Sequence, residues 1–357
     1  MMVAHLLVGG GVLLAAAVWV SAADTMPGTA PATRPAATRP VGGAKKPLVA
    51  YLDPETAGVD YKIQGEYALN KDGSGLGGQV MALRDKAGNT TFHAVVFPGG
   101  LPGAGWDGRA RIELNGKLNA DKAELTDARG SKITADGVTL AGRLENPVAE
   151  IKLMKVARTS PTMGAQPPEG AFVIFDGKNT DNLNNAKMDE RGLLGVSEPK
   201  GGPRTKKDFT DFALHVEFLV PFVPAGMGQE RGNSGVYMQY RYEVQVLDSF
   251  GLVAKDDDCG GVYKNAAPTV NMCFPPLTWQ TYDIDFTAAR FADGKKVKNA
   301  QVTVKQNGVL IVENAEVKGP TGSGNMKEDA TPGPIYFQDH FNPVYYRNIW
   351  VVEKKMP

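Results

Sequence analysis

The sequence predicts an all-β protein, with a C-terminal β-sandwich of the jelly-roll type preceded by a smaller all-β domain. Short apolar runs are separated by Gly, Asn and Asp turns along most of the 357 residues. Helical periodicity is nearly absent. Two Pro-rich breaks interrupt the chain, and about two domains are expected at this length.

The first 47 residues are predicted to lie outside the folded domains. Residues 1–23 contain the run LLVGGGVLLAAAVWV followed by SAAD, which is typical of a secretory signal cleaved near Ala23. His5 precedes this run without any Lys or Arg, so an uncleaved anchor or a misassigned start codon are the alternatives. Residues 24–47 are rich in Pro, Ala and Thr and are expected to form a disordered linker. We therefore expect a periplasmic or secreted protein.

The composition limits the classes of molecule that we expect the protein to bind. Lys and Arg number 39, as do Asp and Glu, and no long basic run is present, so nucleic acid is not expected. No segment of the mature chain has the ~18 apolar residues that a membrane helix needs. Cys259 and Cys273 could form one disulfide or remain two buried thiols. The sequence identifies no metal site and no cofactor, and it leaves a divalent metal open.

Each folded region is defined by its pattern of strands. Residues 48–157 hold several short apolar runs bounded by turn residues, which predicts a small β-rich domain. The Pro-rich residues 158–170 form a second linker, and residues 171–357 form the larger domain. Within it, KQNGVL is a strong hairpin signal. Eight or more antiparallel strands there must close into two stacked sheets or a barrel.

The stretch YRYEVQVLDS, residues 240–249, reads as a strand with one apolar and one polar face. Tyr242, Val244 and Val246 alternate with Glu243 and Gln245. The polar face could line a ligand cleft or could face solvent.

A second strand with the same pattern lies about a hundred residues further along. In PIYFQDH, Gln338 and His340 share a polar face, and Ile335 and Phe337 share an apolar one. Histidine, with an unperturbed pKa of about 6.5, is suited to carry protons at neutral pH. We expect Gln338 and His340 to face the same cleft as Glu243, and the apolar faces of both strands to pack into one core.

Five further residues each allow two interpretations. Asp248 lies an odd number of positions from Glu243, so it shares its face only if a bulge intervenes, and it could instead form an Asx turn. Arg241 could pair with a carboxylate or anchor a substrate oxygen. Asn233 could cap a turn or bind sugar, and Tyr263 and Arg347 could belong to the sheets or to the site.

Several blocks in the second domain, taken in order, resemble the 3-keto-disaccharide hydrolase domain, long described as a domain of unknown function. They are GNSGVYMQYRYEVQVLDS, GGVY, PPLTWQTYDIDF, VKQNGVLI and PIYFQDHFNPVYYRNIWV, within about 171–355. The resemblance implies a concanavalin-like jelly roll with a ligand cleft on its concave face. It also implies an enzyme that cleaves glycosides already oxidised at C3.

The resemblance also suggests a mechanism. Related glucanases carry three acids on one strand, where this chain has Glu243, Gln245 and Asp248. The amide cannot ionise, so a retaining mechanism with two carboxyl groups about 5–5.5 Å apart is poorly supported. A ketone at C3 acidifies the C2 proton, so one base and a group that stabilises the enolate could expel the C1 substituent by elimination, with hydrolysis as the alternative.

The predicted catalytic residues are Glu243, His340 and Asp248, and the predicted carbohydrate-binding residues are Gln245, Gln338, Asn233, Arg241, Tyr263 and Arg347. An alternative of a different class is a non-catalytic, lectin-like module that binds carbohydrate in the same cleft. Residues 48–157 resemble an accessory domain, for which we expect a structural role.

Overall fold

The structure is a computed structural model that describes residues 37–39, 48–85, 87–197, 201–322 and 324–355. Contacts divide the chain into Met1–Pro35 and Ala36–Pro357, and all described residues belong to the second unit. The predicted secretory signal and most of the first linker lie outside the described residues. The all-β prediction is confirmed, with 46% of residues in strands and 3% in helices.

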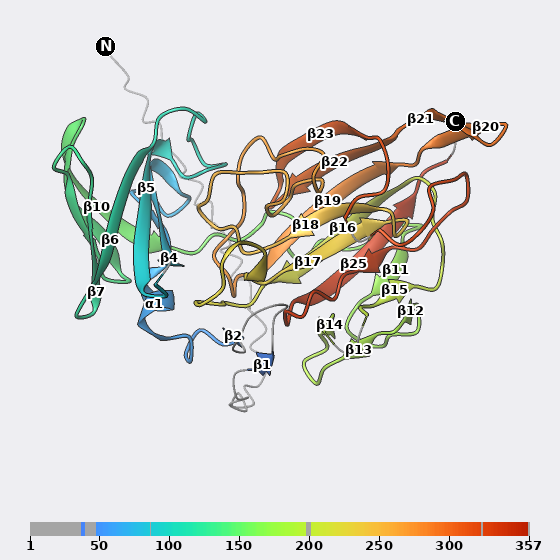
Figure 1. The fold of residues 1–357 in the computed structure, drawn as a ribbon, viewed down its shortest axis with the longest axis horizontal. Coiled ribbons are helices and arrows are strands. Elements are labelled where there is room, and N and C mark those ends of the chain that lie inside the picture. Colours follow the sequence, from blue (N-terminus) through green and yellow to red (C-terminus); the bar gives the residue numbers. More distant parts are fainter. Residues whose placement is uncertain (1–36, 40–47, 86, 198–200, 323, 356–357) are drawn as a thin grey trace, which may run out of the picture. The chain divides into compact units, whose positions relative to one another are not determined.

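A closed eight-stranded barrel forms within the first predicted domain (Figure 1). In chain order its strands are β3 (Gly65–Ala68), β4 (Ser74–Arg84), β5 (Thr90–Gly100), β6 (Ile112–Asn119), β7 (Lys122–Thr126), β8 (Lys132–Ala135), β9 (Thr139–Glu145) and β10 (Val148–Val156). Pairing of β10 with β3 closes the barrel, which removes the exposed strand edges. The short helix α1 (Gly58–Ile63) precedes it, and β1 (Ala37–Arg39) pairs with β2 (Leu48–Ala50).

Two sheets form the sandwich in the second predicted domain (Figure 1). The larger sheet contains β11 (Phe172–Phe175), β13 (Lys187–Met188), β14 (Leu194–Gly195), β16 (Phe212–Leu219), β19 (Gln280–Thr287), β22 (Ala300–Gln306), β23 (Val309–Val317) and β25 (Tyr345–Glu353). The smaller sheet has the order β12 (Leu183–Asn184), β15 (Arg204–Thr205), β24 (Tyr336–Phe337), β17 (Ser234–Met238) and β18 (Tyr242–Val246). A separate ribbon joins β20 (Arg290–Ala292) and β21 (Lys295–Lys298), and a 3₁₀ turn spans Gly228–Glu230. The exact domain boundaries stay a prediction.

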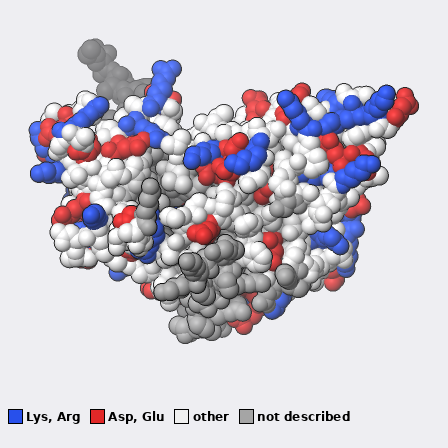
Figure 2. Space-filling model, viewed as in Figure 1, with Lys and Arg blue, Asp and Glu red and all other residues white. Residues whose placement is uncertain are grey.

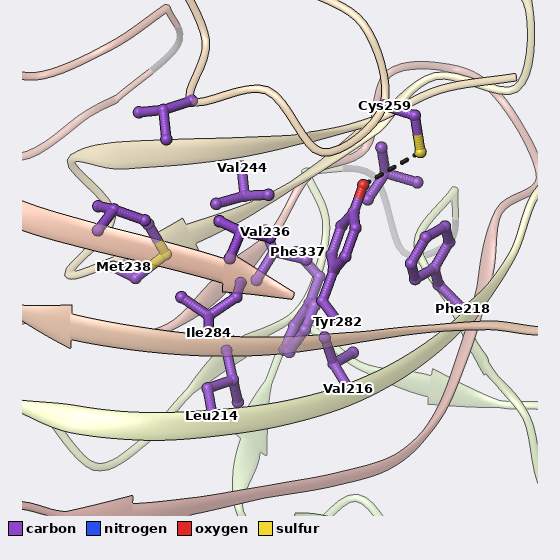
Figure 3. Close-up of a cluster of buried hydrophobic side chains, with 14 of the residues drawn as sticks. Leu214, Val216, Phe218, Val236, Met238, Val244, Cys259, Tyr282, Ile284 and Phe337 are labelled. Carbon is purple, nitrogen blue, oxygen red and sulfur yellow. Dashed lines mark hydrogen bonds between the residues drawn. The ribbon is translucent and has the colours of Figure 1, made fainter. Parts of the chain in front are cut away.

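The core of the sandwich lies between these two sheets. Figure 3 shows side chains of the larger sheet, including Leu214, Val216 and Ile284, facing Val244 and Phe337 of the smaller one. The apolar faces predicted from the sequence share this core, because Val244, Val246, Ile335 and Phe337 all belong to it and are fully buried. Burial of each such side chain contributes about 1.5–3 kcal/mol. The same packing turns the polar side of β18 away from the core.

The predicted hairpin at KQNGVL is confirmed. Strands β22 and β23 pair on either side of Asn307 and Gly308, which both have positive φ angles, 50° and 79°. Only residues that tolerate the left-handed region fit such a tight turn, which explains the Asn-Gly pair.

The two cysteines are free buried thiols, so of the two predicted alternatives the structure shows the second. Cys259 Sγ lies 3.1 Å from the hydroxyl of Tyr282 (Figure 3).

Charges of both signs are interspersed on the visible face of the molecule (Figure 2). That nucleic acid is not a partner stays a prediction. Among the described residues, no helix has the length and apolar character to cross a membrane.

Candidate functional site

A polar cavity of about 60 Å³ lies on the outer face of the smaller sheet. Its lining consists of Gln229, Asn233, Glu243, Gln245, Tyr263, Gly322, Gln338 and His340. Six of the nine residues predicted from the sequence are among them. The lining therefore comes from five separate parts of the sequence, at residues 229–233, 243–245, 263, 322 and 338–340.

Strand register explains this convergence. Tyr237 of β17 pairs with Glu243 of β18, and Gly235 pairs with Gln245. On the other side of β17, the backbone N–H of Gln338 donates to the carbonyl of Gly235 at 2.9 Å. Side chains of paired residues lie on the same face of a sheet, so the polar residues of the three strands meet.

The larger sheet helps to fix β18 from beneath. Tyr282 of β19 reaches across the core, and its hydroxyl donates a hydrogen bond of 2.6 Å to the backbone carbonyl of Gln245. A buried phenol needs such a partner, and this one ties the two sheets together directly under the cavity.

Glu243 is the one carboxylate of the cavity lining, and its side chain is almost fully buried. The hydroxyl of Tyr237 donates a hydrogen bond of 2.7 Å to Oε2. Burial raises the pKa of Glu243 to about 7, and the Tyr237 hydrogen bond opposes that rise only in part. A carboxyl group with such a pKa exchanges protons readily near neutral pH.

Gln338 extends this arrangement by one more hydrogen bond. Its Nε2 donates to the hydroxyl oxygen of Tyr237 at 3.0 Å. Because the phenol proton is directed at Glu243, the phenol oxygen is free to accept, and this fixes the orientation of the Gln338 amide.

A second group of amides is held in place on the other side of the cavity. Asn233 Nδ2 donates to the backbone carbonyl and to Oε1 of Gln229, at 2.9 and 2.8 Å. Gln245 Nε2 also donates to Gln229 Oε1, at 2.9 Å. The Nε2 of Gln229 donates to the backbone carbonyl of Asp257 at 2.8 Å. Each amide is thereby oriented by its neighbours.

Tyr263 and Gly322 form the wall nearest to Glu243. The backbone N–H of Tyr263 donates to the carbonyl of Glu243 at 3.1 Å. A Cβ atom added at Gly322 would lie 2.9 Å from Glu243 Oε2 and 3.1 Å from the ring of Tyr263. Gly322 also has a φ of +44°, so glycine is required both by space and by conformation.

His340 lines the cavity from the loop that follows β24. Its backbone carbonyl accepts a hydrogen bond of 3.0 Å from Asn342 Nδ2, which steadies the loop. The ring atom Nδ1 is buried and has no hydrogen-bond partner.

The structure places Asp248 outside this cavity. Its Oδ2 forms a buried ion pair with Arg231 Nη2 at 2.7 Å, and its Oδ1 accepts from the N–H of Phe250 at 3.3 Å. The second contact is the Asx turn that the sequence allowed. Because both carboxylate oxygens are engaged there, the geometry does not join Asp248 to Glu243.

Arg241 also lies outside the cavity lining, and its side chain is buried. Its guanidinium donates to the carbonyls of Lys327 and Thr331, at 2.8 and 2.9 Å, and to Asp329 Oδ1 at 3.0 Å. Arg241 thus anchors the segment around 327–331 rather than facing a ligand.

Arg347 belongs to β25 of the larger sheet and is remote from the Glu243 cavity. Its Nε donates to Glu217 Oε2 at 2.7 Å, and its guanidinium lies 4.0 Å from the ring centroid of Trp279. Burial alone would raise the pKa of Glu217, but hydrogen bonds from Asn348, Gly164 and Arg347, together with His215 Nε2 at 3.7 Å, lower it to about 2. These contacts form an ion-pair and hydrogen-bond network on the larger sheet.

Sequence reasoning missed Tyr237, Gln229 and Gly322. Tyr237 was within reach, since GVYMQ precedes the Glu243 strand and a hairpin there would place an aromatic opposite the acid. No strand period bears on Gln229 and Gly322, which lie in irregular segments. Among the residues that the structure describes, no three His, Cys, Asp or Glu side chains gather as a metal-binding group.

Comparison with known proteins identifies a family over the sandwich. A family model described as the 3-keto-alpha-glucoside-1,2-lyase-like domain matches residues 170–352. A search of curated proteins found no match.

Similar solved structures include two presumed glycosyl hydrolases from Parabacteroides distasonis ATCC 8503. The first, at 2.13 Å resolution, is 36% identical over 52% of this chain and 85% of that chain, with a TM-score of 0.49. The second, at 1.70 Å, is 19% identical over 52% of this chain and 95% of that chain, with a TM-score of 0.38.

Proposed function

Since the chain belongs to the 3-keto-alpha-glucoside-1,2-lyase-like domain family and is carbohydrate-active, we propose that it is an enzyme that cleaves 3-keto-glycosides by elimination. The reaction takes place in the cavity around Glu243. The observation that carries this proposal is a single buried carboxylate with a pKa of about 7, held by Tyr237 among oriented amides.

The chemistry of a 3-keto-glycoside needs one base. Glu243 removes the proton from C2, and the electrons of the C–H bond form an enolate with the C3 carbonyl. The enolate then collapses to a C1=C2 double bond and a restored ketone, while the C1–O bond breaks and the aglycone leaves with its electron pair. The aglycone takes up a proton, and later addition of water across C1=C2 gives the free 3-keto-sugar.

His340 is suited to the second role. A nitrogen that lines the cavity and has no protein partner can donate a hydrogen bond to the enolate oxygen or a proton to the aglycone. Tyr237 is a positioning residue, because its hydrogen bond holds one oxygen of Glu243 and leaves the other for the substrate.

Ordinary retaining hydrolysis fits the cavity less well. That mechanism uses two carboxyl groups about 5–5.5 Å apart. The described lining contains one carboxylate, and Asp248 is held in its ion pair with Arg231.

Release of the aglycone from 4-nitrophenyl 3-keto-α-D-glucopyranoside by the full chain tests the proposal. We expect release from the ketone and none from the unoxidised glucoside, because only the ketone acidifies C2. No release from the ketone, with and without added divalent metal ions, would contradict the proposal.

We further propose that the protein acts outside the cytoplasm, on the strength of the apolar run and small-residue site within residues 1–23. Expression in a bacterial host followed by fractionation and N-terminal sequencing checks this. A chain that stays in the cytoplasm with Met1 intact would contradict it.

A further inference from the structure

Unpaired polar atoms are concentrated in the Glu243 cavity. Among the described residues, six buried side-chain nitrogen or oxygen atoms have no hydrogen-bond partner. Three of them line this one cavity: Asn233 Oδ1, Gln338 Oε1 and His340 Nδ1. Buried polar groups are almost always paired, so three such atoms in one place indicate a partner that the protein itself does not supply.

The two amide oxygens are held as acceptors by the bonds of their own nitrogens. Asn233 Nδ2 faces two acceptors on Gln229, so the amide cannot turn over without losing both hydrogen bonds. Gln338 Nε2 faces the phenol oxygen of Tyr237, whose proton is committed to the Glu243 carboxylate. An amide oxygen accepts and never donates, so each requires a donor from the ligand.

The third atom complements these two. An imidazole nitrogen that carries the ring proton donates a hydrogen bond. With the ring proton on Nδ1, His340 is a donor, and the cavity presents two acceptors and one donor in addition to the base Glu243.

The size of the cavity limits what enters it. A volume of about 60 Å³ is well below the roughly 300–1,000 Å³ of pockets that enclose a whole small-molecule ligand. One oxygen-bearing edge of a sugar ring therefore fits better than a whole ring with its substituents.

We propose that Asn233 and Gln338 determine substrate specificity, by accepting hydrogen bonds from the two ring hydroxyls that flank the oxidised carbon. The C2–C3–C4 edge of a 3-keto-glucoside presents hydroxyl, carbonyl and hydroxyl, which matches two acceptors and one donor in number and kind. This inference rests on the proposed function and names its substrate class more closely, as 3-keto-glycosides with free hydroxyls at both C2 and C4.

The test measures kcat/KM of the full chain for methyl 3-keto-α-D-glucopyranoside and for its 2-deoxy and 4-deoxy analogues. With the unaltered protein, each deoxygenation should lower kcat/KM by about tenfold to a hundredfold, because it leaves a buried acceptor unpaired. This series needs no variant, so it does not depend on the folding of altered chains.

Two variants then show which amide oxygen accepts from which ring hydroxyl. Asn233→Ala should remove the discrimination at one of the two ring positions and keep it at the other, and Gln338→Ala should do the converse. Discrimination is the ratio of kcat/KM for the parent ketone to kcat/KM for a deoxy analogue. A general loss of activity, such as one caused by disturbing Tyr237, lowers both values equally and cancels in this ratio. Gln301→Ala, on β22 of the other sheet, is the matched amide control and should keep both discriminations.

The possible outcomes distinguish a failure of this inference from a failure of the proposed function. Turnover of the parent ketone with both deoxy analogues equally good, or with discrimination unchanged in both alanine variants, would overturn the inference alone. Absence of turnover of any 3-keto-glycoside would overturn the proposed function, and the inference with it.

Discussion

Tyr237 and Glu243 are directly paired across the β17–β18 hairpin, and the phenol of the first donates a hydrogen bond of 2.7 Å to the carboxylate of the second. The bond leaves one carboxylate oxygen to act and sets the direction in which it points. This relationship places a base beneath an amide-lined cavity.

Replacement of Glu243 by Gln should lower turnover of a 3-keto-glycoside by about a hundredfold or more, the usual contribution of a general base. The variant should fold, because the amide has nearly the same shape and loses only a buried charge. Rates of aglycone release and thermal unfolding, measured side by side, check this. Unchanged turnover would remove Glu243 from the mechanism.

The pH dependence of the reaction should show the pKa of Glu243. Because burial raises that pKa to about 7, kcat/KM should fall as the pH drops through about 7 and the base becomes protonated. In Tyr237→Phe the hydrogen bond that lowers this pKa is lost, so the acidic limb should move to higher pH. Tyr240→Phe, which removes a hydroxyl from the neighbouring ring packed edge-on against Tyr237, is the control. An acidic limb at the same pH in all three proteins would contradict the assignment.

The raised pKa of Glu243 also predicts how the stability of the protein depends on pH. The folded protein keeps the Glu243 proton up to about pH 7, whereas the unfolded chain releases it near the ordinary value of 4.5. The unfolded state therefore binds fewer protons between these values, and the free energy of unfolding should fall as the pH rises through this window, by up to about 3 kcal/mol. Denaturant titrations of the wild type and of Glu243→Gln, which lacks this contribution, should diverge accordingly. Parallel curves would show that the pKa is not raised.

Gly322 should tolerate no side chain. In Gly322→Ala the new Cβ would lie 2.9 Å from Glu243 Oε2, and the residue would have to keep a φ of +44°. We expect a loss of turnover of about tenfold or more, the scale on which small displacements at a reacting centre act. Gly319→Ala is the matched control, since its Cβ would meet no atom within 4 Å. Equal activity of the two variants would show that the wall near Gly322 is not part of the site.

Arg347 should matter for stability and not for the reaction. Arg347→Ala removes the hydrogen bond to buried Glu217 and the contact with Trp279, so the free energy of unfolding should fall by about 1–3 kcal/mol. Its kcat/KM should match that of Arg129→Ala, an exposed arginine of the barrel. A raised KM with unchanged stability would restore Arg347 to the carbohydrate-binding residues.

The sequence predicted best where strand alternation governs side-chain direction. Glu243 and Gln245 were placed on one face of their strand, and Gln338 and His340 on one face of another, because a strand has a period of two. The apolar residues between them were placed in the core for the same reason. Strand alternation predicts the face on which a side chain lies, but it does not predict which residues that side chain contacts. The ion pair of Asp248 with Arg231 and the hydrogen bonds of Arg241 to 327–331 join segments whose proximity depends on the whole fold.

Strand alternation could not predict the roles of residues in loops. Gln229 orients two amides of the cavity from a 3₁₀ turn, and Gly322 closes its wall from an irregular segment. Neither lies in a periodic pattern, and each acquires its role only from the residues that surround it in the folded chain.

In the proposed mechanism Glu243 takes the C2 proton, and the fate of a deuterium at C2 reports on this step. A 3-keto-glucoside carrying deuterium at C2 is incubated with the full chain, and the released sugar is analysed by mass spectrometry against an enzyme-free control for spontaneous exchange. We expect the sugar to lose its C2 deuterium as the aglycone is released, and we expect Glu243→Gln to abolish both events. Release of the aglycone with the C2 deuterium retained would contradict it.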